Sequence, residues 1–237
     1  MKVTMEVADD MKITYYGHSA VLVEEEGKRI IIDPFLTGNP KAPVKAEDIQ
    51  VDAVLLTHGH ADHFGDAVEI ARRNDCPVIA VAELADYCSA QGAKVHSMNL
   101  GGGHQFDGFH VKFTLAFHSS SLMVDGQTIY MGEPAGILLT IGGKTFFHAG
   151  DTALFGDMRL IGETNSIDAA VLPIGDGYTM GPEDALLAAK WLRASRVIPV
   201  HYNTFPGIEQ DGNAFCDRLH KEGIEGKALN PGESLEF

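Results

Sequence analysis

The chain has 237 residues, enough for one large domain or two small ones, with 33 acidic residues against 18 basic ones. Its formal net charge of −15 argues against nucleic acid and anionic membranes as partners, because such partners generally require a basic face. No segment stays apolar for the ~20 residues that a membrane span needs, so no membrane association is expected.

The first half of the chain predicts short strands followed by alternating strands and helices. Pro34 ends the third strand, and an irregular loop with two prolines follows over residues 36–48. The predicted strands are Lys12–Tyr16, Ala20–Glu24, Arg29–Asp33, Ala53–Leu56 and Val78–Val81, and the predicted helices are Gly65–Asn74 and Ala82–Gln91.

The second half begins with strands around two tight-turn signals, Asp107-Gly108 and Gly142-Gly143, and then returns to strand–helix alternation. The predicted strands lie within His104–Phe117 and over Gly136–Ile141, Lys144–His148, Ala169–Pro173 and Val197–Val200; the predicted helices are Thr152–Gly162, Pro182–Ala194 and Asn213–Glu222. Helices on the outer faces of strands predict a layered α/β fold. Because the two halves are loosely alike, we expect a single domain over residues 11–237.

The cellular compartment is predicted from the cysteines and the N-terminus. Cys76, Cys88 and Cys216 lie far apart without a C-x-x-C pair, which is typical of ordinary thiols in a reducing compartment. Residues 1–10 are acidic and have no apolar core, so they are not a secretory signal. We therefore expect a cytoplasmic protein with a flexible N-terminal extension over residues 1–10.

The strongest functional signal is the segment 57–65, which reads Thr-His-Gly-His-Ala-Asp-His-Phe-Gly. It places His58, His60, Asp62 and His63 directly after an apolar strand. Imidazole and carboxylate are ligands of first-row metals, and a loop between a strand and a helix lets them converge on one ion. Four such residues so close together predict a metal site.

This H-x-H-x-D-H order resembles the signature of the metallo-β-lactamase superfamily. Later motifs of that family follow in order: Ala116-Phe117-His118-Ser119, the segment Phe147-His148-Ala149-Gly150-Asp151-Thr152, and Pro199-Val200-His201-Tyr202. The resemblance runs from about residue 12 to the C-terminus and implies a four-layer αββα sandwich. It also implies two divalent metal ions, one held by His58, His60 and His118, the other by Asp62, His63 and His201, with Asp151 bridging them.

Three further segments narrow the resemblance, namely Gly17-His18-Ser19, Ile32-Asp33-Pro34-Phe35 and residues 173–182. Together they are similar to a short-chain branch of metal-dependent hydrolases related to sugar-phosphate lactonases. Relatives in this branch often assemble, so a homo-oligomer is consistent with the resemblance, although no residue predicts one. The ligands are all nitrogen or oxygen, which fits zinc first and leaves manganese or iron open.

The expected reaction is hydrolysis of an ester, lactone or phosphodiester bond in a small molecule, with Asp62 as the catalytic carboxylate that orients water or moves its proton. Asp33 and His18 are candidates for orienting a ligand or lining the pocket, whereas His148 is interpreted as structural. Candidate substrate contacts are Asp176, Tyr178 and Thr179 in a glycine-rich loop and Tyr202 and Asn203 after the last metal motif. The alternatives are nucleic-acid cleavage, redox chemistry at a di-iron site, and a regulatory protein that has lost catalysis.

Overall fold

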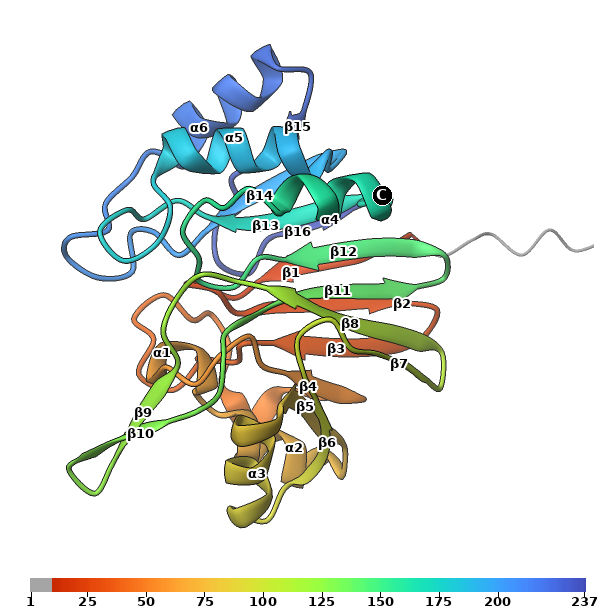
Figure 1. The fold of residues 1–237 in the computed structure, drawn as a ribbon, viewed down its shortest axis with the longest axis vertical. Coiled ribbons are helices and arrows are strands. Elements are labelled where there is room, and N and C mark those ends of the chain that lie inside the picture. The colour runs from red at the N-terminus through yellow and green to blue at the C-terminus, as the bar shows by residue number, and fades with distance from the viewer. Residues whose placement is uncertain (1–9) are drawn as a thin grey trace, which may run out of the picture.

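Two seven-stranded sheets form the centre of the computed structural model, which describes residues 10–237. The predicted extension over residues 1–10 therefore lies outside the described residues except for Asp10. The first sheet has the order β16-β1-β2-β3-β4-β5-β6 and the second the order β15-β14-β13-β12-β11-β8-β7. A separate two-stranded hairpin, β9 (Ser121–Val124) and β10 (Gln127–Tyr130), projects from this body (Figure 1).

Each sheet is antiparallel at one end and parallel at the other. The strands of the first sheet are β1 (Lys12–Tyr15), β2 (Val21–Glu25), β3 (Lys28–Ile32), β4 (Ala53–Leu55), β5 (Pro77–Val81), β6 (Lys94–Met98) and β16 (Ser234–Glu236). Those of the second sheet are β7 (Gly103–Phe106), β8 (Phe109–Leu115), β11 (Ala135–Ile141), β12 (Lys144–His148), β13 (Ala169–Pro173), β14 (Arg196–Val200) and β15 (Glu225–Gly226).

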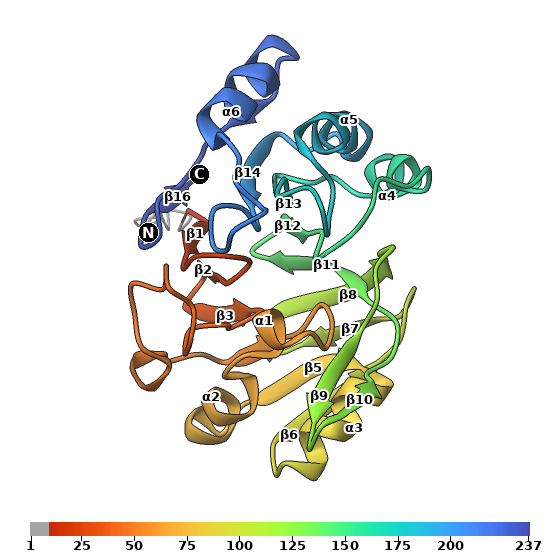
Figure 2. The same ribbon diagram turned by 90° about the vertical axis from the view of Figure 1, so that its left-hand side faces the viewer.

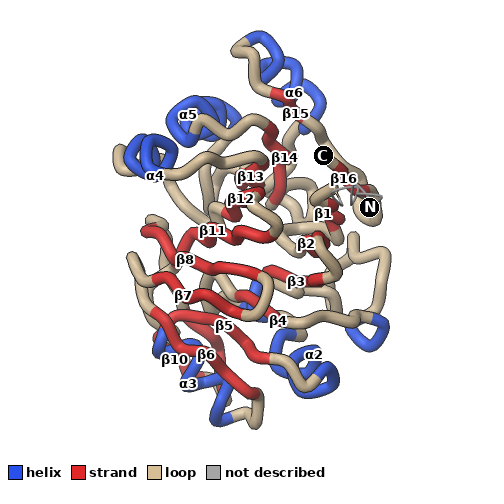
Figure 3. Tube along the Cα trace, turned by 90° about the vertical axis from the view of Figure 1, so that its right-hand side faces the viewer, coloured by secondary structure: helices blue, strands red, loops and turns tan. Residues whose placement is uncertain are grey.

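Helices cover the outer face of each sheet, which gives the predicted four-layer αββα sandwich (Figures 2 and 3). The helices of the first half are α1 (Ala61–Phe64), α2 (Ala67–Asn74) and α3 (Ala82–Ala90), together with the 3-10 turn η1 (Ala46–Asp48); those of the second half are α4 (Met158–Thr164), α5 (Pro182–Leu192) and α6 (Gly212–Lys221). In the described part of the chain, no helix has both the length and the apolar character needed to cross a membrane.

Alternating side chains in the second sheet build two apolar layers. In β12, Phe146 packs into the core between the sheets, whereas the neighbouring Phe147 packs under the helices. In β11, Ile137 and Leu139 likewise join the inner core and Leu138 joins the outer one. Successive side chains of a strand point to opposite faces, so a strand covered on both sides reads as a continuous apolar run.

The structure differs from the sequence-based expectation in the connections. The predicted helix Thr152–Gly162 was placed too early, because α4 begins only at Met158. Thr152 instead accepts a hydrogen bond from the backbone N–H of Phe117 at 2.9 Å, and Ala153 donates to the Phe117 carbonyl, which holds this stretch extended. Strand β6, the hairpin β9–β10 and the one-turn helix α1 were not predicted.

The strand order brings the functional motifs to one end of the sandwich. The loops after β12, β13 and β14 and helix α1 lie at the same end, on the left in Figure 1 and facing the viewer in Figure 2. Because β3 and β4 are parallel, Asp33 and the segment that begins at Thr57 leave the first sheet side by side. The two sheets therefore each present their ligand-bearing loops to the other.

Candidate metal centre

Helix α1 shapes the segment that carries the H-x-H-x-D-H motif. The His63 and Phe64 N–H groups both donate to the His60 carbonyl, so the chain makes one tight turn between His60 and Gly65. Gly59 must be small, because a Cβ there would overlap the side chain of Met131. The turn brings Asp62 and His63 to the same side of the loop as His58.

Three groups of side chains at this end of the fold could each hold a metal ion; one of them, Asp33 with His58 and His63, shares its histidines with the other two. In each group, one nitrogen or oxygen per residue lies within 4.8 Å of all the others. The first group is His58, His60, His118 and Asp151, and the second is His18, Asp62, His63 and His201. All seven residues of the expected ligand set are therefore brought together, and His18 joins them.

Asp151 lies between the two groups. Its Oδ2 is 3.5 Å from Nε2 of His118 in the first group and 3.1 Å from Nε2 of His201 in the second. Its Oδ1 is 3.3 Å from Nε2 of His63. Burial raises the pKa of this carboxyl, but the facing His63 and His201 outweigh burial and hold it well below the ordinary value. Asp151 is thus a carboxylate within reach of both groups.

Asp33 and Thr57 support the histidines from behind. Asp33 is fully buried, and its Oδ2 accepts hydrogen bonds from the Thr57 hydroxyl at 2.6 Å and from Nδ1 of His63 at 2.8 Å. The Thr57 hydroxyl is in turn 2.9 Å from Nδ1 of His58. With both Nδ1 atoms held from behind, His58 and His63 each turn Nε2 toward the centre.

His18 holds the carboxylate of Asp62. Its Nε2 donates to Oδ2 of Asp62 at 3.0 Å, and its Nδ1 is 3.0 Å from the Thr204 hydroxyl. Burial lowers the pKa of His18 to about 4, although the hydrogen bond to Asp62 acts in the opposite direction. His18 is therefore a neutral donor near pH 7. Because its ring is held between Thr204 and Asp62, it fixes the position of one Asp62 oxygen.

Buried polar atoms without hydrogen-bond partners also indicate that these residues fit a metal ion. Nε2 of His63 and Oδ1 of Asp151 are buried and have no hydrogen-bond partner among the described residues, although they face each other. A buried polar atom without a partner is unfavourable, and lone pairs that converge on one point are what a cation requires. Nitrogen and oxygen donors of this kind suit zinc, manganese or iron.

Comparison with known proteins decides the family. A family model described as the beta-lactamase superfamily domain matches residues 28–202. A UPF0173 metal-dependent hydrolase of Bacillus cereus (strain ATCC 10987 / NRS 248) is 59% identical over 227 residues, which cover 95% of this chain and 99% of that protein. The protein belongs to the metallo-β-lactamase superfamily. It is a metal-dependent hydrolase, as its relatives are named.

Solved structures of related hydrolases share the architecture of this protein. Igni18, a metallo hydrolase from Ignicoccus hospitalis, is 39% identical with a TM-score of 0.88, covering 96% of this chain and 98% of its own. An isothiocyanate hydrolase from Delia radicum gut bacteria is 25% identical with a TM-score of 0.75, covering 96% of this chain and 99% of its own. The αββα sandwich of this hydrolase is therefore that of the superfamily.

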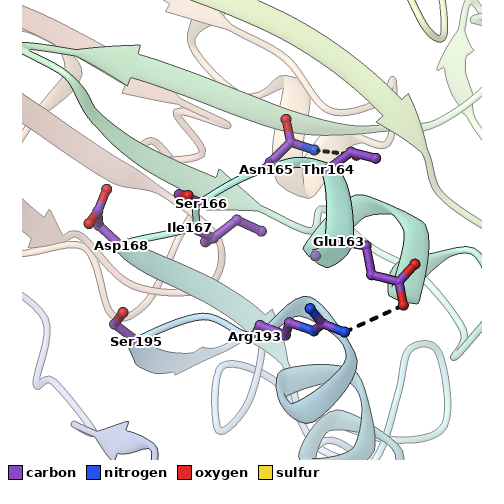
Figure 4. Close-up of a pocket in the computed structure, with 9 residues that line it drawn as sticks. Glu163, Thr164, Asn165, Ser166, Ile167, Asp168, Arg193 and Ser195 are labelled. Atoms are coloured by element: carbon purple, nitrogen blue, oxygen red, sulfur yellow. Dashed lines mark hydrogen bonds and ion pairs between the residues drawn. The ribbon is translucent and has the colours of Figure 1, made fainter.

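A cavity of about 430 Å³ opens onto the centre of the hydrolase. It is lined by His60, Asp62, His118, Ser119, Asp151, Tyr178, His201, Phe205, Pro206 and Ile208. A slightly larger hollow of about 470 Å³ lies at the ends of α4 and α5 (Figure 4). It contains none of the motif residues, and its Arg193 already pairs with Glu163 at 3.4 Å. The chemistry of the ligands, rather than volume, therefore identifies the candidate site.

The predicted substrate contacts separate into two classes. Tyr178 lines the cavity. Asp176 instead accepts the N–H of Gly177 in its own loop, and Asn203 exchanges hydrogen bonds with the backbone of Gln210. Tyr202 packs against α6, where a Cβ on Gly212 would overlap its hydroxyl. These three residues, like Thr179, are not among the residues that line the cavity.

Four residues of the cavity were missed in the sequence, namely Ser119, Phe205, Pro206 and Ile208. Ser119 directly follows His118, so the motif could have predicted that it lies at the site. The other three belong to the segment after His201, and only the Phe205-Pro206-Gly207 turn signal pointed to a loop there. His148, interpreted as structural, donates from Nε2 to the Ser19 carbonyl at 2.9 Å and accepts the N–H of Gly150.

Proposed function

We propose that the protein uses two divalent metal ions, zinc first with manganese or iron as alternatives, to hydrolyse an ester, lactone or phosphodiester bond of a small molecule. The first ion is assigned to His58, His60 and His118 and the second to Asp62, His63 and His201, with Asp151 shared. The observation that carries the proposal is the position of Asp151, whose two oxygens lie 3.1–3.5 Å from histidine nitrogens of both groups.

When bound, the ions supply Lewis acidity, which polarises the attacked bond and lowers the pKa of water. The chain supplies the positioning. Asp62 lines the cavity with one oxygen held by His18, so its other oxygen would lie beside the second ion, where it can orient a water and accept its proton. The water oxygen bonds to the attacked carbon or phosphorus, the bond to the leaving oxygen breaks, and the leaving oxygen takes up a proton.

The competing interpretations have weaker support. Nucleic-acid cleavage would call for basic side chains around the cleft, and none of the residues that line the cavity is Lys or Arg. A regulatory protein without catalysis would be expected to lack ligands, whereas all seven are brought together. The similarity to an isothiocyanate hydrolase supports hydrolysis of a small molecule.

Elemental analysis of the untagged protein, paired with hydrolysis of small chromogenic esters, lactones and phosphodiesters, tests the proposal. We expect close to two metal ions per chain and activity that a chelator abolishes and added metal restores. A metal-free protein, or a metal-loaded one inert on every substrate, would support the regulatory interpretation instead.

A further inference from the structure

The cavity at the metal centre has two chemically different walls. One wall consists of the histidines, aspartates and Ser119 of the centre. A second wall consists of Tyr178, Phe205, Pro206 and Ile208, which come from the loops after β13 and β14. The reacting group must lie at the first wall, so the second wall contacts the rest of the substrate.

The ring of Phe205 and the backbone of the Tyr178 loop are held in place. The ring of Phe205 lies 5.4 Å from that of His18 and 6.2 Å from that of Phe35, measured between centroids. Tyr178 lies in a closed loop in which the N–H of Asp176 donates to the Met180 carbonyl at 3.1 Å. A wall that is ordered before binding loses little conformational entropy when a ligand arrives.

Both aromatic side chains are nevertheless exposed to water. Tyr178 is 72% exposed and Phe205 is 38% exposed, although the strands behind them are buried. Exposed aromatic rings in the lining of a cavity are typical of a ligand-binding surface, because covering the rings would remove apolar area from water. The rings are therefore placed to cover an apolar group.

Charge selects against anions at the same wall. Among the described residues that line the cavity, there is no lysine or arginine, and the chain as a whole carries a net charge of −15. An anionic group on the distal part of a substrate would lose water against the apolar wall without gaining a partner, which is unfavourable.

We propose that the substrate is an uncharged ester or lactone whose acyl part carries an aromatic or branched apolar group that packs on Phe205 and Tyr178. The inference rests on the proposed hydrolase function and narrows it to acyl compounds, so it leaves out phosphodiesters, and the apolar wall excludes acyl groups with a distal phosphate or carboxylate. The metal centre binds the reacting oxygen, and the apolar wall contacts the remainder of the acyl group.

The test compares four para-nitrophenyl substrates with the metal-loaded enzyme: the acetate, the phenylacetate, the phenylacetate that carries a para-carboxylate on its ring, and the bis-ester of phosphate. We expect kcat/KM for the phenylacetate to exceed that for the acetate by about tenfold, the value of covering one ring. We expect the carboxylated ester and the phosphodiester to be at least about tenfold poorer than the phenylacetate.

Two variants assign the selectivity to the wall. Phe205→Ala should lower the ratio of phenylacetate to acetate kcat/KM toward one. Tyr178→Arg should raise the ratio of carboxylated to plain phenylacetate by about tenfold, because it supplies the missing partner charge. Leu160→Arg is the matched control, because it adds the same charge at a position outside the cavity lining. Leu160 lies on α4 and is 56% exposed.

The outcomes separate the two proposals. Equal or faster turnover of the carboxylated ester or the phosphodiester overturns the substrate class and leaves the hydrolase function standing. A shift in Leu160→Arg as large as that in Tyr178→Arg also overturns it, because net charge would then explain the effect. Absence of turnover on all four substrates by protein with its metals bound counts against both.

Discussion

The carboxylate of Asp33 lies 2.8 Å from Nδ1 of His63, and both side chains are fully buried. Through the hydroxyl of Thr57, at 2.6 Å, the same carboxylate also reaches the histidine of the other ligand group, His58. A single buried residue that binds no metal in the proposed assignment thus orients one ligand of each ion. Such outer partners fix the tautomer and ring orientation of metal-binding histidines.

Replacing Asp33 with Asn should weaken both metal sites. The Asp33 carboxylate is surrounded by three donors, the Thr57 N–H and hydroxyl and Nδ1 of His63, and an amide would turn its own N–H₂ toward one of them. We expect about a 10–100-fold loss of metal affinity, measured by competition with a chromogenic chelator. Asp168→Asn, which alters a carboxylate that accepts the Thr145 N–H elsewhere, is the control. Unchanged affinity in Asp33→Asn would contradict the role.

Replacing Asp62 with Ala should reduce kcat by about 10²–10⁴-fold, the usual contribution of a positioned acid or base, and more if the second ion is also lost. Kinetics and metal content measured on the same preparation distinguish the two effects. Asp52→Ala, at a carboxylate that accepts the Arg29 N–H away from the metal centre, serves as the control. Full activity in Asp62→Ala would show that another group orients the water.

Much of the fold was predictable because the chain alternates strands and helices, and the layered α/β prediction is confirmed. The predicted element boundaries were wrong where tertiary contacts override the local pattern, as at Thr152, whose hydroxyl accepts a hydrogen bond from the Phe117 N–H. The motifs indicated which residues converge, but the place of His18 depends on its bond to Asp62 across 44 residues. The apolar wall at Phe205 follows from loop packing against Phe35, which no local signal encodes. One domain over residues 11–237 stays a prediction, supported by the core that the two sheets share.

Acid should destabilise the metal-free protein through His18. Its folded pKa of about 4 lies below the ordinary value of 6.5, so the unfolded chain binds a proton that the folded chain does not between these values. The free energy of unfolding therefore falls as pH falls from 6.5 to 4, by about 3 kcal/mol from this group. Urea unfolding across this range should show a shallower pH dependence in His18→Gln than in the parent. His220→Gln, at an exposed position of α6, should keep the parent's slope.

Removing the metals should lower the thermal stability of the protein. An ion present at 100 times its Kd stabilises the folded state by about 2.7 kcal/mol, and each kcal/mol shifts the Tm of a chain of this size by about 2–4 °C. Calorimetry with and without chelator should therefore show a decrease of about 5–10 °C or more. The double variant His96→Ala/His104→Ala, which removes a histidine pair with rings 4.2 Å apart away from the centre, should retain the decrease. If the double variant showed no decrease in Tm with chelator, the metal would be bound at that histidine pair instead.

Gly65→Ala should destabilise the fold and the metal centre together. Gly65 has φ +41°, and a Cβ there would lie 2.5 Å from the carbonyl oxygen of Pro34 and from Cα of Phe35. These are backbone atoms next to Asp33, so they cannot give way without moving the carboxylate that orients His63. We expect a loss of at least about 3 kcal/mol in urea unfolding, with reduced metal content at saturation. Gly156→Ala, where no heavy atom lies within 4 Å of the added Cβ, should change stability by at most about 0.5 kcal/mol. If the two variants were equally stable, the contact between the metal-binding loop and the Asp33 segment would not constrain the site.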